Sequence, residues 1–144
     1  MNFKKDLQFG QSYELELLKH IPHDKYIQAQ GNFKAYDLKI YKDGKISRYE
    51  VKSDRITHYT NNITIEYECY KKPSGITTTR AKHYAYFVVK PNNTYDLYII
   101  PVKKIKKYIE QKQYRKELSG GNYNSSKFYL FHKSKFEKYK KNLI

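Results

Sequence analysis

The stretch YDLKIYKDGKISRYEVKSD, residues 36–54, predicts a β-hairpin around which the rest of the chain is organised. Apolar and polar residues alternate from Tyr36 to Tyr41, which is the period of a half-buried strand. The dipeptide Asp43-Gly44 favours a tight turn, because glycine adopts positive φ at little cost. A second alternating run follows from Arg48 to Lys52, so the two runs are expected to pair as neighbouring strands.

The second strand is expected to place Glu50 and Lys52 on the face opposite Tyr49 and Val51. Asp37, on the first strand, then lies close to Glu50. Two neighbouring carboxylates repel each other unless a cation lies between them. Mg²⁺ is typically bound by one or two carboxylates together with water and phosphate oxygens. Lys52 lies one strand period from Glu50, so its ammonium group can reach a metal-bound water.

This spacing resembles the PD-(D/E)xK nuclease superfamily, whose signature is an Asp followed by Glu-x-Lys on the next strand. Here Asp37 is followed by twelve residues and then by Glu50-Val51-Lys52. Tyr36 stands where the superfamily often has proline. The resemblance implies an α/β fold with a restriction-endonuclease-like core, in which a central mixed β-sheet is flanked by helices.

The resemblance also implies roles for these residues. Asp37 and Glu50 would hold one or two Mg²⁺ ions, with Mn²⁺ able to substitute. The carbonyl oxygen of Val51 would be an additional ligand. Lys52 would orient or deprotonate the attacking water.

A helix is expected over residues 3–21, with Glu14 as a carboxylate on its apolar face. The segment Gly10-Gln11-Ser12-Tyr13-Glu14 resembles the first helix of many superfamily members, including archaeal-type Holliday junction resolvases. That resemblance implies that Glu14 completes the catalytic and metal-binding set. The alternative is a salt-bridged Glu at the edge of the core, with Glu16 as the substitute candidate. Glu66 or Glu68 could also join the acidic site.

Residues 62–86 resemble a corresponding run in small phage and viral members of the superfamily. Glycine, hydroxyl groups and flanking lysines in this run suit a loop that contacts phosphate. Alternatively, one of its hydroxyls caps a short helix expected over residues 79–84. The candidate nucleic-acid-binding residues are Lys71, Lys72, Ser74, Gly75, Thr77, Thr78, Thr79, Arg80 and Lys82.

Hydrophobic periodicity predicts the remaining elements. A helix is expected to begin after Pro101, because proline is accommodated at a helix start. The expected elements are a loop or edge strand over 25–33, a loop over 58–62, a strand over 63–69, a central parallel strand over 84–89, a strand over 95–100, a helix over 102–113, a loop over 119–121, an edge strand over 128–131 and a helix over 133–144.

Length and composition predict one domain over residues 1–144, with a nuclease-like core over about 10–90 and a basic elaboration over 101–144. No apolar run is long enough to span a membrane. The first residues lack the apolar centre of a signal peptide, and Cys69 is the single cysteine. The chain is therefore expected to be intracellular rather than secreted.

Positive charge is concentrated in the second half of the chain. Residues 1–69 hold 11 Lys/Arg and 10 Asp/Glu, whereas residues 70–144 hold 18 and 4, which gives net charges of +1 and +14. Nucleic acid is the expected partner, and an anionic membrane surface is the alternative. The 17 tyrosines suit base stacking. They also fit a compositional bias, because Lys, Asn and Ile are frequent as well.

Together these observations predict a Mg²⁺-dependent DNA endonuclease that hydrolyses phosphodiester bonds. It would be structure-specific like a junction resolvase, or of the homing or restriction kind. Paired active sites would make it a homodimer or higher homo-oligomer. The alternatives are a non-catalytic nucleic-acid-binding module with a degenerate nuclease fold, and an enzyme that acts on RNA.

Overall fold

The computed structural model describes residues 12–31, 35–121 and 125–143, and the hairpin predicted at residues 36–54 is present. Strands β2 (Leu38–Lys42) and β3 (Lys45–Asp54) pair antiparallel. They are joined at Asp43 and Gly44, whose φ angles are 51° and 75°. Two successive positive φ angles give the turn a twist that matches the twist of the flanking strands.

The hairpin belongs to a five-stranded mixed sheet with the order β1-β2-β3-β6-β7. β1 (Lys25–Gln28) is an edge strand, β6 (His83–Val89) runs parallel to β3, and β7 (Tyr95–Pro101) is antiparallel to β6. The strand expected over 84–89 and its parallel pairing are thus confirmed, but the central strand of the sheet is β3. β6 is buried along nearly its whole length, which explains its continuous apolar sequence.

A second, antiparallel sheet has the order β5-β4-β9-β8. It contains β4 (Asn62–Cys69), β5 (Lys72–Pro73), β8 (Lys116–Gly120) and β9 (Ser126–His132). The strand expected over 63–69 is confirmed. The edge strand expected over 128–131 is in fact β9, which lies between β4 and β8, and the loop expected from residue 119 begins as strand.

The helices are shorter than predicted. The described part of the helix expected over 3–21 is helical at residues 12–17 and continues as turns to residue 20. α3 (Val102–Glu110) ends before residue 113. The tail forms a 3₁₀ helix, η3 (Lys133–Tyr139), followed by a bridge from Lys140 to Tyr98.

Two further local predictions were wrong. Residues 57–60 form a one-turn helix, α2 (Thr57–Thr60), where a loop was expected. Residues 79–82 are not helical, and a 3₁₀ turn, η1 (Gly75–Thr77), precedes them instead.

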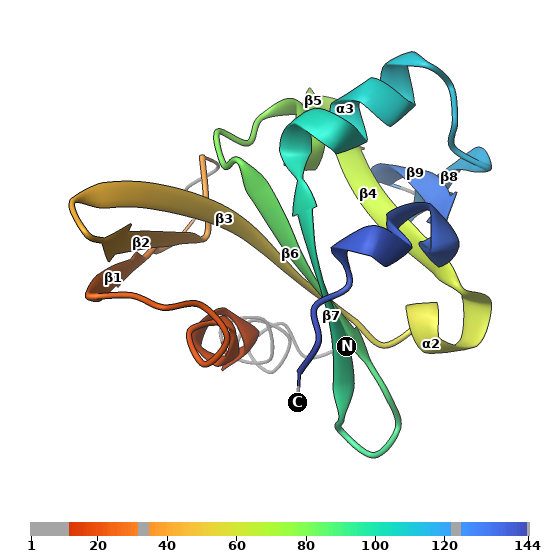
Figure 1. The fold of residues 1–144 in the computed structure, drawn as a ribbon. Coiled ribbons are helices and arrows are strands. Elements are labelled where there is room, and N and C mark those ends of the chain that lie inside the picture. The colour runs from red at the N-terminus through yellow and green to blue at the C-terminus, as the bar shows by residue number, and fades with distance from the viewer. Residues whose placement is uncertain (1–11, 32–34, 122–124, 144) are drawn as a thin grey trace.

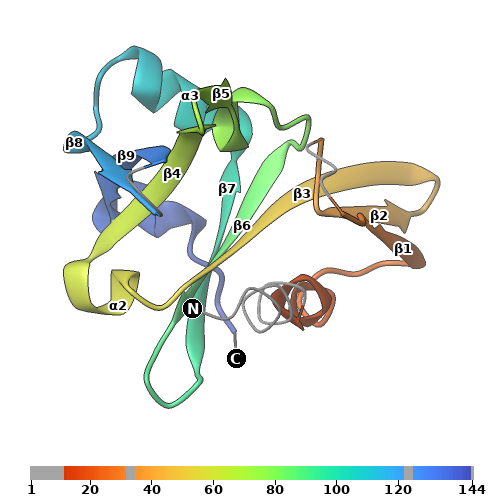
Figure 2. The same ribbon diagram turned by 180° about the vertical axis from the view of Figure 1, so that it is seen from behind.

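The five-stranded sheet has an apolar core on each face. On one face, Leu17 of the N-terminal helical segment packs with Leu38, Phe87 and other side chains of the sheet. On the other face, Tyr84 and Tyr86 meet residues of β4, β9, α3 and η3. Figures 1 and 2 show from opposite sides that the N-terminal helical segment lies on one side of this sheet and that β4, β9 and α3 lie on the other. The sheet was expected to be flanked by helices, but the second sheet covers much of one face.

Tyr86 links the two sheets through hydrogen bonds of its hydroxyl group. This fully buried side chain lies on β6, and its hydroxyl donates to Asp54 at the end of β3. The same oxygen accepts from the backbone N–H of Thr64 on β4, 3.2 Å away. The hydroxyl of Thr57 lies 3.3 Å away.

Tyr86→Phe is expected to lower the free energy of unfolding by about 1–3 kcal/mol, because buried polar partners lose their hydrogen bonds. Urea denaturation measures the change. Tyr26→Phe, at a tyrosine that is 45% exposed, is the control and should leave stability unchanged. Equal stabilities of the two variants would contradict this role for the Tyr86 hydroxyl.

Candidate active site

Three carboxyl groups from separate elements influence one another electrostatically. Glu14 lies on the N-terminal helical segment, Asp37 directly before β2, and Glu50 on β3. All three are partly buried. The negative charge of Asp37 raises the pKa of both Glu14 and Glu50, so the groups predicted as the acidic set lie in one neighbourhood.

Asp37 is held in place by β3. Its backbone N–H donates to the carbonyl oxygen of Tyr49 (3.0 Å), which continues the antiparallel pairing of β2 and β3. Its Oδ2 atom accepts the N–H of Val51 (2.8 Å). Burial raises the pKa of Asp37, while hydrogen bonds from Val51 and Glu50 and the charge of Lys52 act in the opposite direction.

Glu50 has the largest pKa change of the three. Burial, and then the charge of Asp37, raise its pKa to about 8. The hydroxyl of Thr79 donates to its Oε1 atom at 3.0 Å, which favours the ionised form. Glu50 and Asp37 are also hydrogen-bonded to each other, so without a cation the pair shares a proton at neutral pH.

Glu14 is held by a residue that sequence reasoning missed. Nε2 of Gln28, on the edge strand β1, donates to Oε1 of Glu14 at 3.1 Å. Burial, and then the charge of Asp37, raise the pKa of Glu14 to about 7, which the Gln28 hydrogen bond partly opposes. No local pattern in the sequence marks Gln28, because its contact depends on how β1 and the helical segment meet.

Lys52 follows Glu50 by one strand period, as predicted, and its side chain is exposed. Its positive charge is close enough to lower the pKa of Asp37. Lys52 is therefore the cationic side chain that acts on the carboxyl pair, and it is accessible from solvent.

The chemistry of the donor set suits a hard divalent cation. Asp37 and Glu50 supply carboxylate oxygens, and like-charge repulsion between them is what a cation would relieve. The described residues contain no group of three or more His, Cys, Asp and Glu side chains arranged to hold an ion. Asp37 and Glu50 are therefore the two residues that could hold a cation, with Glu14 beside them.

The other candidate carboxylates have separate partners. Glu16 forms a salt bridge with Lys19 (2.9 Å) and accepts a hydrogen bond from the hydroxyl of Tyr95. Glu68 pairs with Lys127 (3.2 Å) in the second sheet. Glu66 accepts a hydrogen bond from the hydroxyl of Ser74 (3.0 Å), and its charge, like those of Glu50 and Asp37, raises the pKa of buried Tyr84.

In the loop predicted to contact phosphate, the hydroxyl groups donate hydrogen bonds to other groups of the protein. Thr77 donates to the carbonyl of Tyr67 (2.9 Å), and Thr79 bonds Glu50. Gly75 has a φ of +53°, and a Cβ there would lie 2.2 Å from the carbonyl oxygen of Glu66, so only glycine fits the turn. The exposed members of the predicted set are Lys71, Lys72, Thr77, Arg80 and Lys82, whereas Ser74, Gly75 and Thr78 are partly buried and Thr79 is buried.

No helix in the described part of the chain is long and apolar enough to cross a membrane. Compared with protein-family models, curated proteins and solved structures, the chain matches none of them.

Proposed function

We propose that this chain is a Mg²⁺-dependent DNA endonuclease with a restriction-endonuclease-like core, acting through Asp37, Glu50 and Lys52. The single observation that carries the proposal is the Asp37–Glu50 pair, in which burial and mutual repulsion raise the pKa of Glu50 to about 8. Carboxyl pairs with strongly shifted pKa values occur at catalytic and metal sites more often than elsewhere. The basic second half of the chain, with a net charge of +14, supports a nucleic-acid substrate.

In this proposal Asp37 and Glu50 would hold the cation, and the Val51 carbonyl would be an additional ligand. A bound Mg²⁺ would supply Lewis-acid polarisation of the phosphate and lower the pKa of a water. The backbone N–H of Val51 and the hydroxyl of Thr79 each fix one carboxylate oxygen.

Two further side chains have assigned roles. Lys52 Nζ would orient the attacking water or accept its proton, because its side chain is exposed and its charge acts on Asp37. Glu14, held by Gln28, would orient a water at the edge of the pair or bind a second cation.

The second candidate is a nucleic-acid-binding module without catalysis. It is favoured by the lack, among the described residues, of a three-group cation site. It predicts salt-sensitive binding but no cleavage with any divalent metal.

The test is incubation of the purified protein with Mg²⁺ or Mn²⁺ and linear, circular, single-stranded and branched DNA. Metal-dependent cleavage of at least one DNA, abolished by EDTA, is the expected result. Binding without cleavage of any of them in either metal would favour the module instead. Substrate choice among the four would separate junction-like from restriction-like activity, and sedimentation would show whether the protein is the dimer that paired active sites require.

A further inference from the structure

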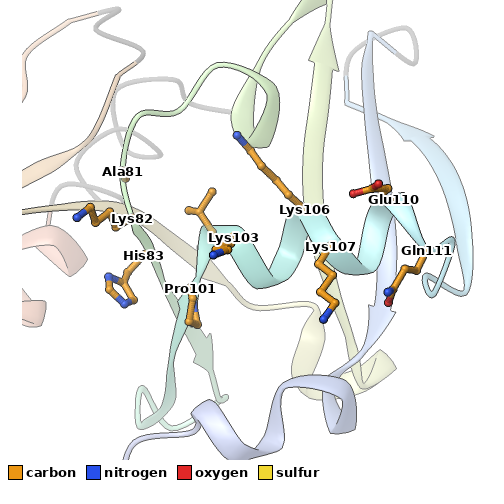
Figure 3. A pocket seen from close by; sticks show the side chains of 10 residues that line it. Ala81, Lys82, His83, Pro101, Lys103, Lys106, Lys107, Glu110 and Gln111 are labelled. Carbon is orange, nitrogen blue, oxygen red and sulfur yellow. The ribbon is translucent and has the colours of Figure 1, made fainter.

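A pocket lies beside β6 and α3, away from the carboxyl pair. Its volume is about 980 Å³, near the upper end of the roughly 300–1,000 Å³ typical of ligand sites. Figure 3 shows that two stretches far apart in the sequence line it, the start of β6 with the residues before it, and α3 with Pro101. Its apolar lining residues are Ala81, Pro101 and Val102, of which Pro101 is partly exposed and the other two are buried.

Four lysines make the rim of this pocket strongly positive. Lys82 precedes β6, and Lys103, Lys106 and Lys107 extend from α3 (Figure 3). All four are exposed, and the ion pairs of the described residues use other lysines. Glu110 is the one acidic residue in the lining. The net charge of the lining favours an anion.

An aromatic ring adds a surface on which a base can stack. His83 lines the pocket from the Tyr49 side of the sheet, opposite the face on which α3 packs, and its ring stacks on Tyr49 with centroids 5.8 Å apart and an angle of 29°. Burial, and then the charge of Lys82, lower the pKa of His83, so its ring is neutral at neutral pH. A neutral ring stacks on bases without preference for one base, because every base has a π face.

The pocket is linked to the carboxyl pair by a short, fixed segment. The hydroxyl of Thr79 donates a hydrogen bond to Glu50. Three residues later, the N–H of Lys82 donates to the carbonyl of Arg48 on β3 (3.3 Å). The carbonyl of Lys82 accepts the N–H of Val102 at the start of α3 (2.8 Å). In addition, His83 is the β-sheet partner of Tyr49, the residue before Glu50. The pocket and the carboxyl pair therefore lie at the two ends of one short segment, residues 79–82.

We infer that this pocket binds a nucleotide of the DNA strand that flanks the cleaved bond, with its phosphates on the rim lysines and its base against His83 and the apolar surface. The inference rests on the proposed function for the identity of the strand. An anionic phosphate joined to an apolar, planar base is the ligand chemistry that matches a lysine rim around an apolar pocket.

The first test measures binding in EDTA, so that it is independent of cleavage. The triple variant Lys103→Gln, Lys106→Gln, Lys107→Gln is compared with a control, Lys45→Gln, Lys116→Gln, Lys141→Gln, which removes the same charge from exposed positions outside the pocket. Fluorescence anisotropy with a labelled single-stranded oligonucleotide is recorded from roughly 50 to 200 mM salt.

The pocket triple is expected to weaken binding by roughly tenfold or more and to reduce the salt slope by about 2, because each phosphate contact on a single strand contributes about 0.7. The control triple should change the slope by less than half as much. Equal effects of the two triples, or no effect of either, would overturn the inference. Glutamine is a good helix former, so α3 is expected to remain folded, which thermal denaturation checks.

The second test examines the base. An oligonucleotide containing a run of abasic sites should bind the wild type about tenfold more weakly than the normal strand, since stacking is lost. His83→Ala should bind the two strands with similar affinity. If His83→Ala discriminates between them as strongly as the wild type does, the base does not lie against His83.

A nucleotide in the pocket could belong to a DNA strand or be a free nucleotide. Competition with free dAMP distinguishes these two sources. Displacement of the oligonucleotide only at dAMP concentrations far above those of the strand would support a nucleotide held within DNA. Displacement at similar concentrations would show a site for free nucleotides and overturn the role beside the cleaved bond. None of these binding tests needs Mg²⁺. A failure of the nuclease proposal would therefore appear in the cleavage assay, and a failure of this inference would appear in the binding assays.

Discussion

Asp37→Asn is expected to reduce Mg²⁺-dependent DNA cleavage by on the order of 10²–10³-fold, the usual effect of removing a group that stabilises charge in a transition state. The amide keeps the shape of the side chain and leaves an oxygen to accept the N–H of Val51, so the hairpin should stay intact. What is lost is the second negative charge beside Glu50.

The controls for this prediction lie in the same hairpin. Asp43→Asn makes the same chemical change at the exposed turn, where φ is 51° and asparagine is well tolerated. It should cleave at the wild-type rate. DNA binding in EDTA should be unchanged or slightly tighter in both variants, because each removes a negative charge.

Lys52→Ala tests the second half of the assignment. A positioned acid–base group contributes typically about 10²–10⁴-fold, so a loss of that size is expected. Lys45→Ala removes an exposed lysine at the other end of β3 and is the matched control. Wild-type cleavage by both Asp37→Asn and Lys52→Ala would end the nuclease proposal.

The metal-free protein is expected to become less stable as the pH rises from about 5 to about 8.5. Folding raises the pKa of Glu50 from its ordinary value to about 8, so between those two values the folded state binds a proton that the unfolded state has lost. The free energy of unfolding contributed by this group is therefore full at low pH and falls as the pH passes through this window. Because each tenfold change in proton affinity corresponds to about 1.4 kcal/mol, the expected loss of stability is up to about 5 kcal/mol.

Glu50→Gln should remove this part of the pH dependence, because an amide does not titrate. Urea denaturation in EDTA at several pH values measures it, with Glu110→Gln on α3 as the control that keeps the wild-type slope. Adding Mg²⁺ at pH 8 should stabilise the wild type by about 2.7 kcal/mol when the Mg²⁺ concentration is 100 times the dissociation constant. The same addition should not stabilise Glu50→Gln. If the wild type and Glu50→Gln have parallel pH profiles, the carboxyl pair is not coupled as described.

The hairpin could be predicted because its determinants are local. Alternation with a period of two fixes which side chains share a face, and the Asp43-Gly44 turn fixes the register. The same reasoning located β6 and β7 and brought Asp37, Glu50 and Lys52 together, since all three belong to the hairpin itself.

Sheet membership and helix ends could not be predicted in this way. β4 and β9 alternate like the strands of the first sheet, yet they form a second sheet, because strand pairing depends on partners distant in the chain. The tail has helical periodicity, but contacts with β7 hold it as a 3₁₀ helix, because tertiary packing overrides weak local propensity.

The sequence by itself determined the hairpin, its three polar side chains and the excess of positive charge, because each depends only on residue types and near-neighbour spacing. Tertiary structure alone decided that Gln28 holds Glu14, that Thr79 bonds Glu50, and that residues 81–83 and 101–111 enclose one pocket. These contacts join segments separated by many residues, and only the packing of both sheets fixes the distances between them.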